Sequence, residues 1–157
     1  MDNDQASLDR RLSSMLSEAG LRGKQIATSS YDITFTSDLR EWSVNVRMSE
    51  AWVMLRTFVL SLPTAMPRRL ALLENIAQAN ASLSLAKFSL TDDNSICIDL
   101  EYRSEHVGAD TLKHLIGLVV RIGDEHYPKL FRIATGDAAL DALESSFKKP
   151  ATEPEPG

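Results

Sequence analysis

The residues that could carry chemistry in this chain are few and far apart. The spacings of His106, His114 and His126 do not suit a shared metal site, and Cys97 is the only cysteine. Asp110 and His114 lie one helical turn apart, which favours an ion pair over half of a metal site. No pattern typical of a nucleotide-binding loop, a serine nucleophile or a zinc-binding helix occurs. We therefore expect no catalytic residues, no bound metal and no cofactor.

Length and composition restrict the class of protein. A chain of 157 residues suits one domain with a single core. Its 17 Lys and Arg against 22 Asp and Glu give a net charge of -5, which repels phosphate backbones. The longest apolar stretches, at 51–60 and 115–122, are shorter than the roughly 20 residues of a membrane-spanning helix. We expect a cytoplasmic protein that binds neither nucleic acid nor a membrane.

Hydrophobic periodicity indicates an α+β fold. Apolar residues at helical spacing predict helices over 8–19, 70–83 and 110–127, and β-branched and aromatic runs predict strands at 31–36, 42–48, 51–60, 85–90 and 95–102. The expected fold is an antiparallel sheet with helices packed on it, in the order α-β-β-β-α-β-β-α. Pro128 should kink or end the last of these helices, and Gly136 should stop what continues.

One domain is expected to extend over residues 1–147. Its last part, "DAALDALESSF" at 137–147, has the spacing of a further amphipathic helix. Residues 148–157, "KKPATEPEPG", have the composition of a disordered tail.

The strand at 51–60, "AWVMLRTFVL", is apolar at nearly every position, so neither set of its side chains plainly faces water. A two-residue turn at Ser49 and Glu50 would join it to the preceding strand. The core face would then hold the pairs Met48–Ala51, Val46–Val53 and Val44–Leu55, and the other face the pairs Arg47–Trp52, Asn45–Met54, Ser43–Arg56 and Glu41–Phe58. In the second hairpin, a loop over 91–95 would pair Phe88 with Ile98 and Lys87 with Asp99.

Five residues on this mixed face are candidates for a protein interface: Trp52, Met54, Phe58, Arg47 and Arg56. Aromatic residues, Met and Arg are enriched where proteins bind one another. Stacking of the Arg47 guanidinium on the Trp52 indole would hold the surface open for a ligand. The alternatives for what covers this face are a terminal helix of the same chain, such as 138–147, and a partner chain or substrate segment.

The chain resembles a known family over roughly residues 8–135. The segment "LLENIAQANASLSLAKFSLTDDNSICIDLEY", followed by "TLKHLIGLVVRIGDEHYPKL", is similar to a stretch of the YbjN-like proteins, with Asn80, Lys87, Phe88 and Pro128 at the expected positions. The order of elements resembles the fold of type III secretion chaperones. The resemblance implies a small dimerising domain that binds other proteins or takes part in regulation, with no catalytic residues.

The main functional hypothesis is a non-catalytic module that binds a partner protein or an extended peptide by strand addition or groove binding. It would be chaperone-like or regulatory and act as a homodimer, because the helix at 70–83 and the sheet carry more apolar surface than one core needs. The alternatives are a regulatory or scaffold subunit whose dimer surface is its only function, and a small metal-dependent enzyme.

Overall fold

A computed structural model describes residues 3–136 of the chain. Its elements are, in chain order, α1 (Asn3–Glu18), β1 (Gly23–Ala27), β2 (Ser30–Thr36), β3 (Glu41–Met48), β4 (Trp52–Ser61), α2 (Arg68–Ser82), β5 (Lys87–Leu90), β6 (Ser95–Arg103), the short 3-10 helix η1 (Ser104–His106) and α3 (Ala109–Thr135). The predicted α+β class with an antiparallel sheet is confirmed. The helix predicted at 137–147 and the tail predicted at 148–157 lie outside the described residues.

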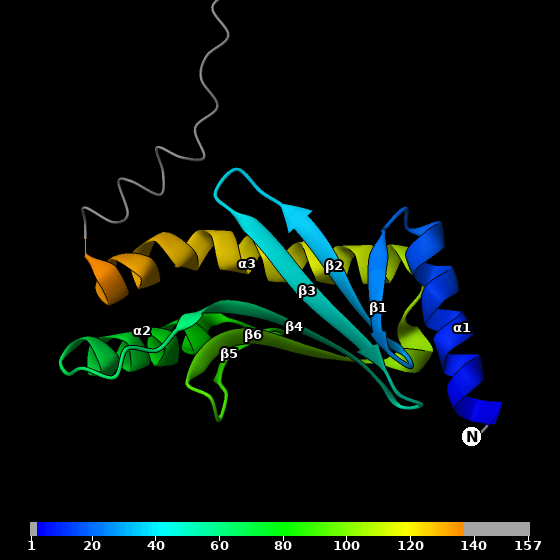
Figure 1. Cartoon of the computed structure of the whole chain (residues 1–157), viewed down its shortest axis with the longest axis horizontal. Coiled ribbons are helices and arrows are strands. Elements are labelled where there is room, and N and C mark those ends of the chain that lie inside the picture. Colours follow the sequence, from blue (N-terminus) through cyan, green and yellow to red (C-terminus); the bar gives the residue numbers. More distant parts are fainter. Residues whose placement is uncertain (1–2, 137–157) are drawn as a thin grey trace, which may run out of the picture.

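The strands form one antiparallel sheet in the order β1-β2-β3-β4-β6-β5. Figure 1 shows α3 running along the long axis of the molecule, with α1 at one end and α2 at the other. α1 and α3 pack on one side of the sheet, which we call the inner face. The side chains predicted for the core are at most 5% exposed: Val44, Val46, Val53, Leu55, Phe88 and Ile98.

The edge strand β1 was not predicted from the sequence. All five of its residues are exposed, so the run has no apolar alternation to mark it. It forms because it pairs with β2 and because α1 holds its end: the Asp9 carboxylate accepts hydrogen bonds from the Gln25 side chain at 3.0 Å and from the Ser29 N–H at 2.8 Å. Contacts between elements, rather than a local pattern, determine this strand.

α3 continues through Pro128 well beyond its predicted end at 127, so the alternative in which this proline ends the helix is wrong. Tyr127 is buried, and its ring packs against Trp42 and Phe131 with centroid distances of 5.9 and 5.4 Å. This packing holds the helix across a residue that lacks a backbone N–H. Gly136, with a φ of 99°, follows the last helical residue as predicted.

Trp42 fixes α3 against the sheet. Its fully buried indole donates to the Asp124 carboxylate at 2.8 Å, and that carboxylate also accepts from the Ser37 hydroxyl at 2.8 Å. The Arg40 guanidinium lies over the indole, 4.1 Å from the ring centroid. The helix approaches this closely because Gly123 has no side chain: a Cβ there would lie 2.6 Å from the indole.

The hairpin between β3 and β4 turns one residue later than predicted. The Ser49 N–H donates to the Trp52 carbonyl at 2.8 Å, so Glu50 and Ala51 form the turn. Every predicted β3–β4 pair is therefore wrong by two residues, and the observed pairs are Val44–Thr57, Asn45–Arg56, Val46–Leu55, Arg47–Met54 and Met48–Val53. A shift by two keeps the side chains within the strands on their predicted faces, because the side-chain period of a strand is two. Ala51, predicted for the core face, instead lies exposed in the turn.

Ser104 of η1 explains the position of this turn. Its backbone N–H donates to the Ala51 carbonyl at 3.0 Å, and its hydroxyl donates to the Glu50 carbonyl. The Arg11 guanidinium of α1 donates to the Ser104 carbonyl at 2.6 Å. The turn is thus held by η1, which is itself held by α1. Both segments are distant in the chain, so a prediction from the turn residues alone could not take their contacts into account.

The hairpin between β5 and β6 has the predicted register, with Phe88 opposite Ile98 and Lys87 opposite Asp99. The Lys87 ammonium, however, donates to the carbonyls of Asn80, at 2.8 Å, and Leu83, at the end of α2. Lys87 therefore caps a helix end, where a cation is favoured.

Candidate binding surface

The face of the sheet opposite the helices, here called the outer face, carries a column of four side chains along β4. Trp52, Met54, Arg56 and Phe58 alternate with residues that are buried in the core. Trp52 is 38% exposed and Phe58 is 46% exposed, although strands pair with β4 on both sides. The column therefore presents aromatic surface to solvent in the middle of the sheet.

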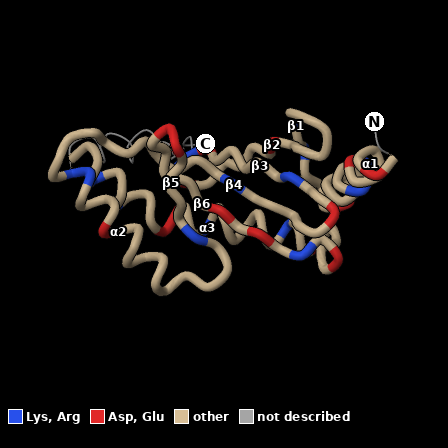
Figure 2. Tube along the Cα trace, turned by 90° about the horizontal axis from the view of Figure 1, so that it is seen from below, with Lys and Arg blue, Asp and Glu red and all other residues tan. Residues whose placement is uncertain are grey.

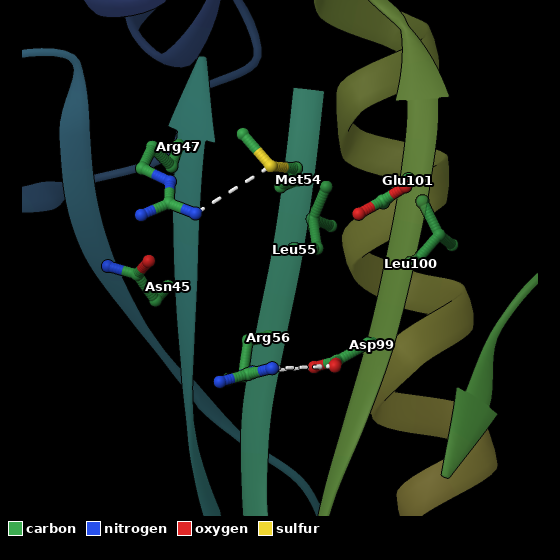
Figure 3. A pocket seen from close by; sticks show the side chains of 8 residues that line it. All are labelled: Asn45, Arg47, Met54, Leu55, Arg56, Asp99, Leu100 and Glu101. Atoms are coloured by element: carbon green, nitrogen blue, oxygen red, sulfur yellow. Dashed lines mark hydrogen bonds and ion pairs between the residues drawn. The ribbon is translucent and has the colours of Figure 1, made fainter. Parts of the chain in front are cut away.

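Two rows of side chains cross this column from strand to strand (Figure 3). The Arg47 row consists of Arg47 on β3, Met54 on β4 and Glu101 on β6. One guanidinium N–H of Arg47 donates to the Met54 sulfur at 3.7 Å. Within residues 3–136 neither Arg47 nor Glu101 forms a salt bridge. This row thus carries one unpaired positive and one unpaired negative charge, on opposite sides of an apolar side chain.

The Arg56 row lies next to it and consists of Asn45, Arg56 and Asp99. Nε and Nη2 of Arg56 donate to the two carboxylate oxygens of Asp99, each at 2.7 Å. This bidentate hydrogen bonding raises the pKa of the Arg56 guanidinium above its ordinary value. The two rows line a hollow of about 180 Å³. Arg56 and Asp99 thus neutralise each other, whereas Arg47 and Glu101 are left to pair with a ligand.

The Arg56 row extends to both edges of the sheet with charges of alternating sign. Its members in strand order are Lys24, Asp32, Asn45, Arg56, Asp99 and Lys87. Figure 2 likewise shows Lys and Arg interspersed with Asp and Glu along the molecule. A surface of mixed sign suits a protein ligand better than a polyanion such as nucleic acid.

Trp52 stacks with Arg103 rather than with Arg47. The Arg103 guanidinium carbon lies 5.1 Å from the Trp52 ring centroid, and this side chain also approaches the Glu105 carboxylate at 3.5 Å. The predicted stacking of Arg47 on Trp52 is wrong because the shifted register places Arg47 opposite Met54. The guanidinium on the indole is instead supplied by β6, which pairs Arg103 with Trp52.

The structure places all five predicted interface residues, Trp52, Met54, Phe58, Arg47 and Arg56, on the outer face. It adds Asp99, Glu101 and Arg103 from β6, which sequence reasoning missed. The pairing of β4 with β6, which brings these residues beside the column, joins segments far apart in the chain and was not predicted. One signal was available: charged positions 99, 101 and 103 alternate with apolar residues along a strand much longer than β5.

The residues considered for chemistry are not brought together. The Nδ1 atom of His114 lies 2.7 Å from the backbone carbonyl oxygen of Asp110, in place of the predicted ion pair. The His126 ring packs edge-on against Phe88, with centroids 5.3 Å apart, and burial raises the pKa of the Cys97 thiol. Among residues 3–136, no three His, Cys, Asp or Glu are placed to hold a metal ion. No helix in that range is long and apolar enough to cross a bilayer.

The architecture is that of type III secretion chaperones. A chain of the heterodimeric ExoU-SpcU complex of Pseudomonas aeruginosa superposes with a TM-score of 0.57 at 16% identity, over 79% of this chain and 98% of that one. A chain of the complex between the Yersinia pestis type III secretion chaperone SycH and a YscM2 fragment gives 0.51 at 17% identity, over 77% and 98%. YbjN from E. coli gives 0.51 at 13% identity, over 82% and 90%.

Residues 9–132 match the YbjN family, which carries the description "Putative bacterial sensory transduction regulator". The match covers most of the chain and includes the segment whose resemblance to this family was noted in the sequence. The chain belongs to the YbjN family. No curated protein matches it.

Proposed function

We propose that this protein is a non-catalytic protein-binding module that acts as a homodimer and uses the outer face of its sheet to contact another polypeptide. The observation that carries the proposal is the β4 column: two aromatic side chains and a methionine lie exposed or half-buried beside unpaired charges. Within the described residues α1 and α3 pack against the inner face and α2 contacts the edge strand β5 (Figure 1), while Trp52 and Phe58 stay exposed. Aromatic residues, Met and Arg are enriched at interface centres, and the rims of interfaces are polar.

The fold supports the same proposal. Several of the solved structures with this architecture are complexes with a second protein, among them ExoU-SpcU and SycH with a YscM2 fragment. The likeness to them is one of fold, so the binding surface of this chain is argued from its own residues. The outer face offers apolar anchors at Trp52 and Phe58 and a polar hollow between the Arg47 and Arg56 rows.

The test is a double substitution of Trp52→Ser and Phe58→Ser. We expect the variant to stay folded and to lose self-association and partner binding, because truncation of an interface anchor often costs at least about 2 kcal/mol of binding. Sedimentation velocity measures self-association, pull-down from the native host measures partner recovery, and thermal unfolding measures the fold. Phe35→Ser is the matched control, since Phe35 is also 38% exposed but lies beside α3.

Two outcomes would contradict the proposal. A double variant that is largely unfolded would mean that these side chains belong to the monomer's own core, where an aromatic truncation costs about 3 to 5 kcal/mol. A double variant that stays folded, with self-association and partner recovery equal to those of the unchanged protein, would mean that binding uses another surface.

A further inference from the structure

We propose that the polypeptide bound to the outer face is a second copy of this chain, related by a two-fold axis that runs parallel to β4. This inference rests on the proposed function, because it identifies the partner for the same surface. The observation that points to it is the order of charges in the Arg47 row, which is self-complementary across β4.

The first step concerns the position of the two unpaired charges. Arg47 and Glu101 lie on the strands that flank β4, opposite the same residue, Met54 (Figure 3). Adjacent strands are about 4.8 Å apart, so the two charged positions are separated by about 10 Å, with Met54 midway. A ligand that satisfies both must present the opposite charges in the reverse order at the same spacing.

The second step is that a rotated copy of the same face does this. Rotation by 180° about an axis parallel to β4 exchanges the β3 side with the β6 side. Arg47 then lies opposite the partner's Glu101, Glu101 lies opposite the partner's Arg47, and Met54 faces its own counterpart. Outer faces stacked at about 10 Å, the usual distance between packed sheets, are within reach of these long side chains.

The third step concerns the column on β4, which would lie along the axis. Trp52, Met54 and Phe58 would each meet the same side chain of the partner, which buries aromatic and thioether surface at the centre of the contact. Arg56 would also approach its counterpart, but each guanidinium is held by both carboxylate oxygens of Asp99. The residues on the axis are therefore apolar or already neutralised.

The orientation with the two-fold axis perpendicular to β4 does not share this complementarity. An axis perpendicular to β4 within the interface would place Arg47 against the partner's Arg47 and Glu101 against the partner's Glu101. Like charges in a contact cost binding free energy and suppress that arrangement. The Arg47 row therefore favours an axis parallel to β4 over an axis perpendicular to it.

The test is charge reversal with complementation. Arg47→Glu and Glu101→Arg, each made alone, place two like-charge pairs in the dimer, so we expect the dissociation constant to rise about tenfold or more at low salt. An equimolar mixture of the two variants places only opposite charges across the contact and should restore association, as should the double variant Arg47→Glu/Glu101→Arg. Sedimentation equilibrium measures all four samples, and Lys113→Glu, on the exposed side of α3, is the matched control.

The outcomes separate this inference from the proposed function. Restored association in the mixture and in the double variant supports the two-fold contact. Single variants that associate as tightly as the unchanged protein, or that are weakened without rescue in the mixture, overturn it. If the charge-reversal variants are weakened without rescue, the Trp52→Ser/Phe58→Ser variant decides what remains. Loss of host-partner recovery in that variant would still support an outer face that binds a different protein. Unchanged partner recovery and unchanged self-association in that variant would overturn the proposed function itself.

Discussion

Gly123 is the residue at which a missing side chain decides the packing of α3. An added Cβ would lie 2.6 Å from the Trp42 indole, which is fully buried and holds Asp124 by a hydrogen bond. We expect Gly123→Ala to lower the free energy of unfolding by about 1 to 3 kcal/mol, because overpacking a dense core displaces its side chains. Urea unfolding followed by tryptophan fluorescence measures this.

Gly117 of the same helix provides the control for this substitution. A Cβ at Gly117 would meet nothing within 4 Å. Gly117→Ala should therefore raise the free energy of unfolding by up to about 1 kcal/mol, through helix propensity alone. Equal effects of the two substitutions would contradict the steric account of how α3 approaches the sheet.

Among the elements, α2 and β5 are joined by one side chain. The Asn80 carboxamide accepts from the Phe88 N–H at 2.7 Å and donates to the Phe88 carbonyl at 3.0 Å, so it satisfies both backbone groups on the open edge of β5. We expect Asn80→Ala to cost about 1 to 3 kcal/mol of stability, because it leaves these part-buried groups unpaired. Amide hydrogen exchange at Phe88 should accelerate together with the loss of stability measured by urea unfolding.

Asn75 offers a matched asparagine in α2. Its side chain bonds only to the carbonyl of Ala71 in the preceding turn. Asn75→Ala should be neutral or slightly stabilising, since alanine has the higher helix propensity. If the Phe88 amide keeps its protection in Asn80→Ala, the carboxamide is not what closes this edge of the sheet.

At the scale of the whole molecule, one face of the sheet is covered by helices and the other carries exposed aromatic residues. α1 and α3 pack on the inner face, while Trp52 and Phe58 lie exposed on the outer face. We expect light scattering at micromolar concentration to give twice the 17.4 kDa mass of one chain. A mass of one chain at every concentration would contradict the homodimer and, with it, the two-fold contact proposed here.

Several features of the fold and of the candidate site followed from the sequence by itself. The alternation of side chains along β3 and β4 assigned Val46 and Leu55 to the core and Arg47 and Trp52 to the other face. The assignment of these side chains to faces of the sheet was correct although the predicted turn was misplaced, because a two-residue shift in register leaves each side chain on the same face. The family followed from a local stretch, and the helix stop at Gly136 from a backbone conformation that favours glycine.

Only the tertiary structure decided which residues meet on the outer face. β1 exists through its pairing with β2, and the β3–β4 turn is set by Ser104 from a distant segment. The adjacency of β4 and β6 brings Glu101 level with Arg47 and puts Arg103, rather than Arg47, on Trp52. The physical reason is that strand order and register depend on contacts between segments remote in the chain, whereas the alternation that assigns a face is a local property of each strand.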